Sequence, residues 1–190
     1  MTRLHRSTAG LRKSSPALRL RSRVAIGLLS LLPLTASATG ADQLEYQVKA
    51  AFLLNFTRFV EWPPESAGAS AASICISGAD PFGGVIDQMV AGETLQGRRL
   101  EVLRVHRPFP ASCRVLFING PEKNVSGLLE PPEPGVLTVS EEAGFLREGG
   151  IIQFVVEKHR VRFDINQSAA AKAGLKISSK LLSIARSVEK

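Results

Sequence analysis

The chain has 190 residues and carries 24 Lys and Arg against 17 Asp and Glu, a formal net charge of +7. Seven of the basic residues and none of the acids lie before residue 24, so residues 39–190 hold 24 − 7 = 17 basic and 17 acidic residues and are neutral overall. A nucleic-acid-binding domain keeps a basic footprint in its folded part, and this balance excludes that class. The 190 − 38 = 152 residues after the first 38 suffice for one domain with its own core.

Residues 1–38 have the three parts of a secretory signal peptide. A basic stretch is followed by the apolar run Val24–Leu32 and by the small-residue triplet Ala36-Ser37-Ala38. The run is shorter than the roughly 20 apolar residues of a transmembrane helix, and an uncleaved anchor helix is the alternative. We therefore expect residues 1–38 to be a signal peptide, residues 39–190 to be a single periplasmic domain, and no membrane-spanning segment to remain after cleavage.

A long, mostly buried helix is predicted first, from Asp42 to Glu61, because apolar residues recur with the helical period over most of its circumference. Pro63-Pro64 ends it. A strand is predicted at Ala72–Ser77, followed by a helix at Pro81–Val90. Asp80 with Pro81 at the first helical position is a helix-start pattern.

The middle of the chain contains strands of two kinds. Arg99–His106 alternates apolar and charged residues, as a half-exposed strand does. Cys113–Ile118 is a nearly continuous apolar run, typical of a central parallel strand. A short helix is predicted at Glu122–Leu129, and a further strand at Val136–Val139 before a turn that Ser140 caps.

The last third predicts a hairpin and then helices. The arms Ile151–Val156 and Arg160–Ile165 flank the turn Glu157-Lys158-His159. In the second arm alternate residues point to opposite faces, so the hairpin is expected to have one wet, charged face, formed by Arg160, Arg162 and Asp164. Helical segments are predicted from Asn166 to near Gly174 and over Ser178–Val188.

Strands that alternate with helices, followed by a hairpin, indicate an α/β fold. We expect a three-layer sandwich with a mixed, mostly parallel sheet and a C-terminal antiparallel hairpin.

Cys75 and Cys113 are the two cysteines of the chain. An even cysteine count in an exported protein favours a disulfide. Closing a loop of 113 − 75 = 38 residues would constrain the unfolded chain by about 4 kcal/mol. Two buried free thiols are one alternative. A redox-active pair is the other, although the chain has no C-x-x-C and no nearby His to lower a thiol pKa.

The sequence contains no recognisable constellation for catalysis or metal binding. His106 and His159 are far apart and no Cys/His cluster has zinc-site spacing. No G-x-S-x-G pattern occurs, and no S-x-x-K pair offers a serine nucleophile. The glycine-rich stretch Gly78–Gly84 is not a G-x-G-x-x-G fingerprint and lacks the Lys of a P-loop. We therefore expect a protein that is not an enzyme, with no catalytic residue, no metal and no cofactor.

Several blocks of residues, in one order along the chain, carry a resemblance to a known family. The opening block, Glu45–Phe56 followed by Phe59–Pro63, resembles the pattern K-A-A-F-L-x-N-F-x-x-F-V-x-W-P of YfiR-like periplasmic proteins. The later blocks that are similar are Ile74–Gly83, Cys113–Ile118, Val136–Ser140, Phe145–Ile152, Arg160–Asn166 and Gly174–Leu182. Together they cover essentially all of residues 42–188.

The resemblance implies a regulatory role. The family's characterised member is a periplasmic repressor that holds a membrane-bound diguanylate cyclase inactive and so lowers cyclic-di-GMP and biofilm formation. Related domains are the extracytoplasmic input of sensor kinases and cyclases. Cys75 and Cys113 match one disulfide of that member, whereas its second disulfide, near Phe145–Ile152, has no counterpart in this sequence.

The first functional interpretation is a non-enzymatic periplasmic protein that binds and restrains an inner-membrane signalling protein, a diguanylate cyclase or a sensor kinase. Pairing of two copies is a further expectation. Such a protein needs exposed anchors, and the candidates are Trp62 and the hairpin charges Glu157, Arg160 and Arg162. The alternatives are that Trp62 is a packing residue and that the hairpin charges are simply solvated.

The second interpretation is a periplasmic module that senses or binds a small solute. Its ligand would occupy a pocket at the C-terminal ends of the parallel strands. Asn55 and Asn166 are the candidate polar groups for that pocket.

Overall fold

The computed structural model describes residues 40–64, 71–120, 129 and 134–190. The predicted signal peptide and the predicted helix Glu122–Leu129, except for Leu129, lie outside these residues. All described residues belong to one compact unit, Ser37–Lys190.

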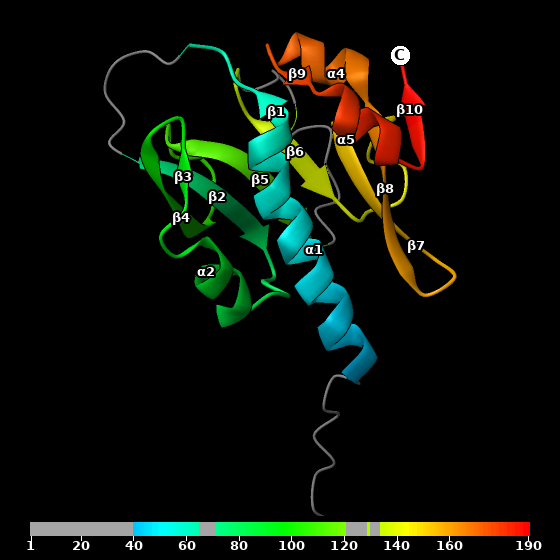
Figure 1. Cartoon of the computed structure of the whole chain (residues 1–190), viewed down its shortest axis with the longest axis horizontal. Helices are drawn as coiled ribbons and strands as arrows, with labels where there is room; N and C mark the ends of the chain where they lie inside the picture. The colour runs from blue at the N-terminus through cyan, green and yellow to red at the C-terminus, as the bar shows by residue number, and fades with distance from the viewer. Residues whose placement is uncertain (1–39, 65–70, 121–128, 130–133) are drawn as a thin grey trace, which may run out of the picture. The chain divides into compact units, whose positions relative to one another are not determined.

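Within the described residues an eight-stranded mixed sheet forms the centre, with strand order β10-β8-β7-β6-β5-β2-β4-β3 (Figure 1). Its strands are β2 (Ala71–Gly78), β3 (Thr94–Leu95), β4 (Arg98–Val105), β5 (Cys113–Asn119), β6 (Leu137–Ser140), β7 (Ile152–Glu157), β8 (Arg160–Asn166) and β10 (Ser187–Glu189). Strands β4, β2, β5, β6 and β7 are parallel, as are β8 and β10, whereas β3 with β4 and β7 with β8 are antiparallel. The predicted α/β fold, with its mostly parallel sheet and C-terminal antiparallel hairpin, is confirmed.

The four described helices of more than one residue are α1 (Gly40–Phe59), α2 (Gly84–Val90), α4 (Gln167–Lys172) and α5 (Ser179–Ile184). Helix α1 ends two residues before the predicted end at Glu61. The reason is a tertiary pairing: β1 (Val60–Glu61) forms a small antiparallel sheet with β9 (Lys176–Ile177). Partners 177 − 60 = 117 and 176 − 61 = 115 residues away in the sequence therefore convert the last residues of the predicted helix into a strand.

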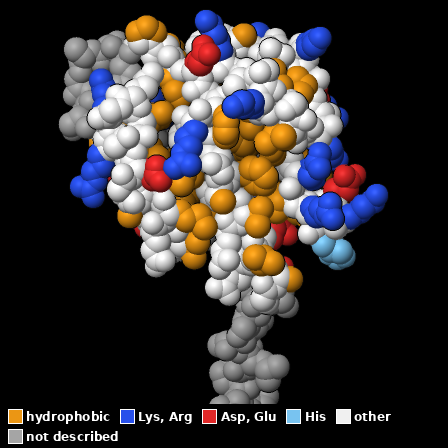
Figure 2. Space-filling view, in the orientation of Figure 1, with side chains coloured by type: hydrophobic (Ala, Val, Ile, Leu, Met, Phe, Trp, Pro, Cys, Tyr) orange, Lys and Arg blue, Asp and Glu red, His pale blue; other side chains and the backbone are white. Residues whose placement is uncertain are grey.

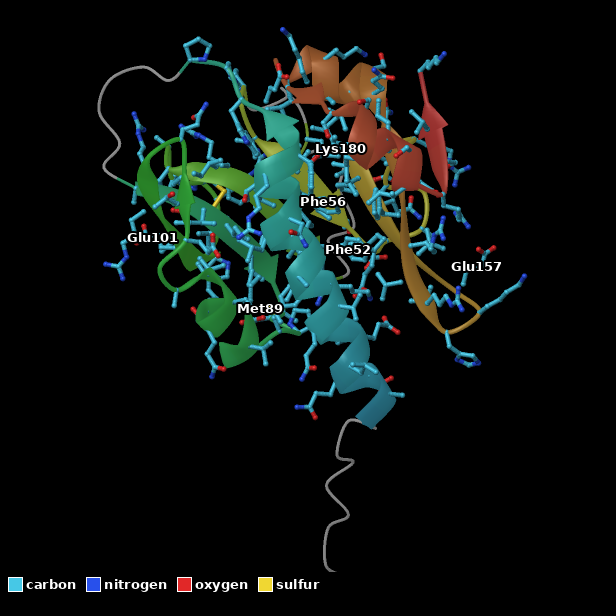
Figure 3. The ribbon with its side chains drawn as sticks, in the orientation of Figure 1. Phe52, Phe56, Met89, Glu101, Glu157 and Lys180 are labelled. Atoms are coloured by element: carbon cyan, nitrogen blue, oxygen red, sulfur yellow. A yellow bond between two sulfur atoms is a disulfide. The ribbon has the colours of Figure 1, made fainter. Side chains whose placement is uncertain are left out.

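The first face of the sheet carries the main hydrophobic core, and α1 packs across it. Phe52 and Phe56 of α1 lie against Phe154 of β7 and Phe163 of β8, with ring centroids 5.3 to 6.1 Å apart. Figure 3 shows Phe52 and Phe56 on the turns of α1 that lie over the sheet. Burial of these rings explains why the helix is apolar around so much of its circumference.

The second face carries a smaller cluster around Cys75, Cys113, Leu116 and Ile118. The residues that cover it are Leu129, Phe145 and Leu146, with Phe109 and Val136 partly buried beside them. In the described part of the chain, this layer consists mainly of turns rather than of long helices.

Two further predicted helix boundaries are wrong. Helix α2 begins at Gly84 rather than Pro81, because the carboxylate of Asp80 accepts hydrogen bonds from the amides of Phe82 (2.8 Å) and Gly83 (3.2 Å) and so forms a turn before the helix.

The predicted terminal helix Ser178–Val188 stops at Ile184, and Ser187–Glu189 form the edge strand β10 along β8. The amide of Arg186 donates to the carbonyl of Phe163 at 2.8 Å, which leads the chain into the sheet.

Candidate binding surface

The hairpin of β7 and β8 presents the charged residues that the sequence singled out. Glu157 lies opposite Arg160 and Val155 lies opposite Arg162 in the antiparallel register. Glu157, Arg160 and Arg162 are all exposed, and Figure 3 shows Glu157 at the outer end of the hairpin. These three side chains are therefore accessible to another molecule.

The hairpin turn has an unusual backbone. Lys158 and His159, the two residues between the strands, have φ angles of 49° and 59°. Positive φ at both central residues is the geometry of the two-residue turn whose twist matches a β-hairpin. Asn and Gly are the residues that adopt it at lowest cost. The turn therefore holds a lysine and a histidine at the tip at a cost in backbone strain.

The predicted wet face of the hairpin is only partly correct, since Asp164 is buried with 6 % of its surface exposed. Its carboxylate accepts a hydrogen bond from Nε of Arg186 at 2.9 Å and a second from Nη2 of Arg186. Burial alone would raise the pKa of Asp164, but hydrogen bonds from Arg186 and Ser187 outweigh it and hold the pKa below its usual range. The pair attaches the C-terminal edge strand to the hairpin.

Trp62 lies in the main core, with 8 % of its surface exposed. Its indole Nε1 donates to the carbonyl of Thr57 at 3.5 Å, at the end of α1. Trp62 is therefore a packing residue, which was the alternative interpretation, and it does not provide an exposed anchor. Of the four candidate partner-binding residues, only the three on the hairpin are at the surface.

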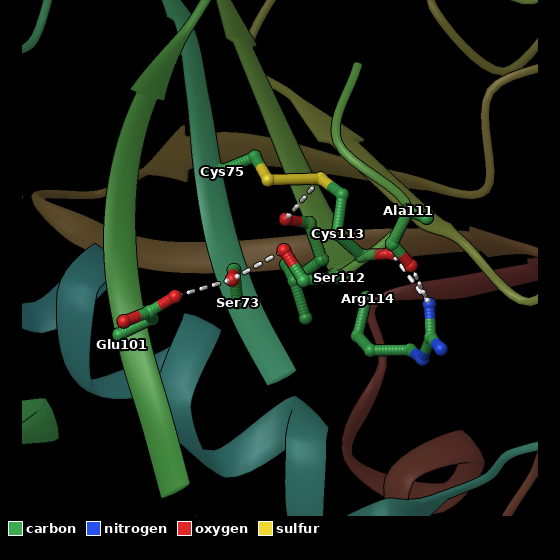
Figure 4. The surroundings of a disulfide bond; sticks show 8 residues. Ser73, Cys75, Glu101, Ala111, Ser112, Cys113 and Arg114 are labelled. Carbon is green, nitrogen blue, oxygen red and sulfur yellow. Dashed lines mark hydrogen bonds between the residues drawn. A yellow bond between two sulfur atoms is a disulfide. The ribbon is translucent and has the colours of Figure 1, made fainter. Parts of the chain in front are cut away.

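The disulfide between Cys75 and Cys113 is present. It joins the neighbouring parallel strands β2 and β5 on the second face of the sheet, with the two Cα atoms 5.9 Å apart (Figure 4). The cysteines are 0 % and 1 % exposed. A bond so enclosed is out of reach of a soluble thiol, which favours a structural role over the free-thiol and redox alternatives.

The strand order reverses at β2, with β4 on one side and β5 on the other, and ligands of open α/β sheets bind at such reversals. Here the two strand ends are joined beyond the sheet: Ala79 N donates to Asn119 O at 3.2 Å, and Asn119 Nδ2 donates to Ala79 O at 2.9 Å. A Cβ on Gly78 would lie 1.7 Å from Asn119 O. The solute-sensing interpretation places its ligand at the C-terminal ends of the parallel strands. At β2 and β5 these ends are in direct contact with each other.

One of the two asparagines proposed for a solute pocket has hydrogen-bond partners within the fold. Asn166 caps α4, since its Oδ1 accepts from the amide of Ala169 at 2.8 Å and its Nδ2 donates to the carbonyl of Leu146 at 3.2 Å. Asn55 is half-buried on α1. The side chain of Asn166 is therefore used to hold the fold rather than to receive a ligand.

A buried lysine is the main polar feature that the sequence did not reveal. Lys49 of α1 is 2 % exposed and its Nζ lies 2.6 Å from Glu45 Oε1 and in contact with Glu141, the residue after β6. The phenol of Tyr46 donates to Glu141 at 3.1 Å. Glu45 was visible from its spacing of four residues before Lys49, but Glu141 is 92 residues away.

The electrostatics of this cluster keep it charged. Burial alone would lower the pKa of Lys49, but hydrogen bonds to Glu141 and Glu45 outweigh burial, so the pKa is raised and the ammonium persists. Burial and the Glu141 carboxylate raise the pKa of Tyr46. The cluster fixes α1 to the carboxyl end of β6 and leaves no nucleophile poised for chemistry.

A second ionic network holds α2 beside the sheet. The guanidinium of Arg104 on β4 binds Asp80 at 2.7 Å and Asp87 at 2.7 Å, and it donates to the carbonyl of Gly83. The hydrogen bond from Arg104 is the main cause of the lowered pKa of Asp87. Asp80 is thus a structural residue of the turn.

Within the described ranges, no group of three or more His, Cys, Asp or Glu side chains is arranged to hold a metal ion. The helices of the described part are each too short or too polar to cross a bilayer.

Comparison with protein families finds a family model that matches most of the described domain. A family model described as YfiR/HmsC-like matches residues 46–186. A comparison with curated proteins found no match. The matched range begins within α1 and ends at Arg186, so it includes the core, the disulfide and the hairpin.

Proposed function

The chain belongs to the YfiR/HmsC-like family, and we propose from this that it is a non-enzymatic periplasmic regulator of cyclic-di-GMP signalling. In this proposal residues 1–38 direct export and are removed, and residues 39–190 form one periplasmic domain. The domain binds and restrains the extracytoplasmic part of an inner-membrane signalling enzyme, a diguanylate cyclase or a sensor kinase. The family match over residues 46–186 is the observation that carries the proposal.

The hairpin of β7 and β8 is the proposed contact for that partner. Arg160 and Arg162 lie two residues apart on one exposed face of β8, and Glu157 lies directly opposite Arg160. Arginine is favoured at protein interfaces because its planar fork makes paired hydrogen bonds to carboxylates and carbonyls. No ion pair ties Arg160 or Arg162 to an acid within the described residues, so both guanidinium groups are available to a partner.

The proposed function is tested by deleting the gene and measuring cellular cyclic-di-GMP. Loss of a repressor should raise the cyclic-di-GMP level and biofilm mass, and the wild-type gene supplied in trans should reverse both changes. An unchanged cyclic-di-GMP level in the deletion strain would count against the regulatory role as a whole.

The hairpin contact is tested separately with the variant Arg160→Glu/Arg162→Glu. Its matched control is Arg99→Glu/Arg147→Glu, which makes the same charge change at two exposed positions outside the hairpin. We expect the hairpin variant to be exported and folded but to leave cyclic-di-GMP as high as in the deletion strain, while the control represses normally. Equal repression by the two variants would remove the hairpin from the interface and leave the regulatory proposal intact.

A further inference from the structure

The C-terminal segment has a composition unlike the rest of the domain. Residues 167–190 contain Lys172, Lys176, Lys180, Arg186 and Lys190 but a single acid, Glu189, and no aromatic residue. Residues 39–190 as a whole are neutral. This segment therefore has an excess of positive charge, and the rest of the domain has an equal excess of negative charge.

The fold gathers this segment at one end of the domain. Helices α4 and α5 and the short strands β9 and β10 lie near one another beside the end of β8 (Figure 1). Lys172, Lys176, Lys180 and Lys190 are all exposed. We call these four residues, together with the neighbouring Ile184, the lysine surface.

The charges of the lysine surface are largely uncompensated. Lys176 is 4.0 Å from Glu61, and both side chains are highly exposed, so that pair is weak. Among the residues that the structure describes, no carboxylate lies within ion-pair distance of Lys172, Lys180 or Lys190. Arg186, in contrast, is bound to Asp164 and is left out of the surface.

An exposed aliphatic side chain lies beside one of these charges, that of Lys180. Ile184 is 53 % exposed and follows Lys180 by four residues on α5, so the two lie on the same side of the helix. Figure 2 shows hydrophobic side chains next to Lys and Arg side chains on the face of the domain that carries Lys180 in Figure 3. Lysines beside an exposed aliphatic group are characteristic of surfaces that lie on a membrane.

We propose that the lysine surface binds the anionic headgroups of phospholipids on the membrane that holds the partner protein. The residue types favour lipid over protein. Protein interfaces are enriched in Tyr, Trp and Arg and depleted in Lys, and the lysine surface has four lysines and no aromatic residue. Lysine is a compact, hydrated charge on a flexible stem, which suits attraction to a mobile array of lipid phosphates.

The expected attraction is weak and sensitive to salt. Each lysine near an anionic surface strengthens binding about fivefold, and the effect falls off within a Debye length. A weak lipid contact becomes effective when the hairpin holds the same domain on a membrane protein, because the second contact then forms at high local concentration. The proposal thus adds a lipid partner to the proposed regulator. Lipid binding by this surface does not depend on the regulatory role.

The test is sedimentation of the purified protein, obtained after expression of the full-length chain, with vesicles at low ionic strength. One set of vesicles is pure phosphatidylcholine and the other has part of it replaced by phosphatidylglycerol. We expect binding only to the anionic vesicles, and release on raising the salt. The variant Lys172→Gln/Lys180→Gln should bind about 25-fold more weakly, at about fivefold for each charge. The control Arg99→Gln/Arg147→Gln removes the same charge elsewhere and should bind like the unaltered protein.

Each other outcome overturns the proposal. No binding to anionic vesicles, or an equal loss in the two variants, would show that the lysine surface is not a lipid site. If Lys172→Gln/Lys180→Gln binds vesicles normally but no longer copurifies with an inner-membrane protein, the surface binds protein instead. The vesicles contain no protein partner, so failure here leaves the regulatory proposal untouched, and circular dichroism verifies that both variants are folded.

Discussion

On the first face of the sheet, α1 brings Phe52 and Phe56 against Phe154 and Phe163, and the packed rings join the N-terminal helix to the C-terminal hairpin. On the second face, a cluster of eight buried residues includes the disulfide of Cys75 and Cys113, under a cover made mainly of turns. A large aromatic surface can exclude water without covalent help. A small cluster under turns buries less apolar area, and a covalent link between its strands offsets that deficit.

The strongest test of this contrast is Phe56→Ala on the first face. Phe56 is fully buried and contacts Phe154 and Phe163, so the variant should lower the free energy of unfolding by about 4 kcal/mol. Urea denaturation measures the change. Leu44→Ala, at an exposed position of the same helix, should change it by less than about 0.5 kcal/mol. Similar losses in the two variants would show that the aromatic face is not the main core.

The double variant Cys75→Ala/Cys113→Ala tests the second face. The sequence separation is 38, for which the chain-entropy model gives about 4 kcal/mol, and native disulfides commonly contribute 2 to 5 kcal/mol. We expect a loss of about 3 kcal/mol in urea unfolding. Amide hydrogen exchange should accelerate more in β2 and β5 than in β7 and β8. Uniform acceleration in all strands would contradict the division of the sheet into two differently stabilised faces.

A smaller effect is expected where the second face reaches the edge of the sheet. Asp164→Asn removes the ion pair with Arg186 and should lower the free energy of unfolding at neutral pH by about 1.5 kcal/mol. The pKa of Asp164 is below its usual value in the folded state. Its stabilisation is therefore present above the ordinary carboxyl pKa of about 4 and is lost as the pH falls below it.

Unfolding midpoints measured from neutral to acidic pH test the direction of this pH dependence. The difference between Asp164→Asn and the unaltered protein should be largest near neutral pH and should shrink below about pH 4. A difference that grows as the pH falls would contradict the assignment of the Asp164–Arg186 pair.

The smallest expected change is a stabilisation at the hairpin tip, outside both clusters. His159 has a φ of 59°, a conformation that costs an ordinary residue about 1 kcal/mol and glycine almost nothing. His159→Gly should therefore raise the free energy of unfolding by up to about 1 kcal/mol. His159→Ala keeps the β-carbon and is the matched control, with little gain expected. Thermal unfolding distinguishes the two, and an equal gain in both would refute the role of backbone strain.

Elements that depend on local pattern were predictable from the sequence. The apolar run Cys113–Ile118 became the central strand β5, and alternation in Arg160–Ile165 became β8. The caps at Asn166 and Ser178 were also at their predicted helix starts. In each case the determining residues are neighbours in the chain, so the periodicity and cap residues suffice.

Features that depend on distant partners were not predictable. The end of the chain leaves the helical pattern because Arg186 meets Phe163 and Asp164. The burial of Lys49 could not be predicted, because its partner Glu141 lies 92 residues away in the sequence. For the candidate surface, the sequence located the hairpin charges but could not show that Trp62 is enclosed, since the burial of a tryptophan is a property of the assembled core.

The junction of α1 with the rest of the domain determines the order in which the chain can fold. The aromatic partners of Phe52 and Phe56, which are Phe154 and Phe163, and the ionic partner of Lys49, which is Glu141, all lie in the last third of the sequence. A chain made from its N-terminus therefore completes α1 long before the rings that cover Phe52 and Phe56 have been made. Contacts of such long sequence separation form slowly, and exposed apolar segments aggregate. A chaperone that shields α1 until the hairpin emerges is thus expected to increase the yield of folded protein more than the domain's modest size would suggest.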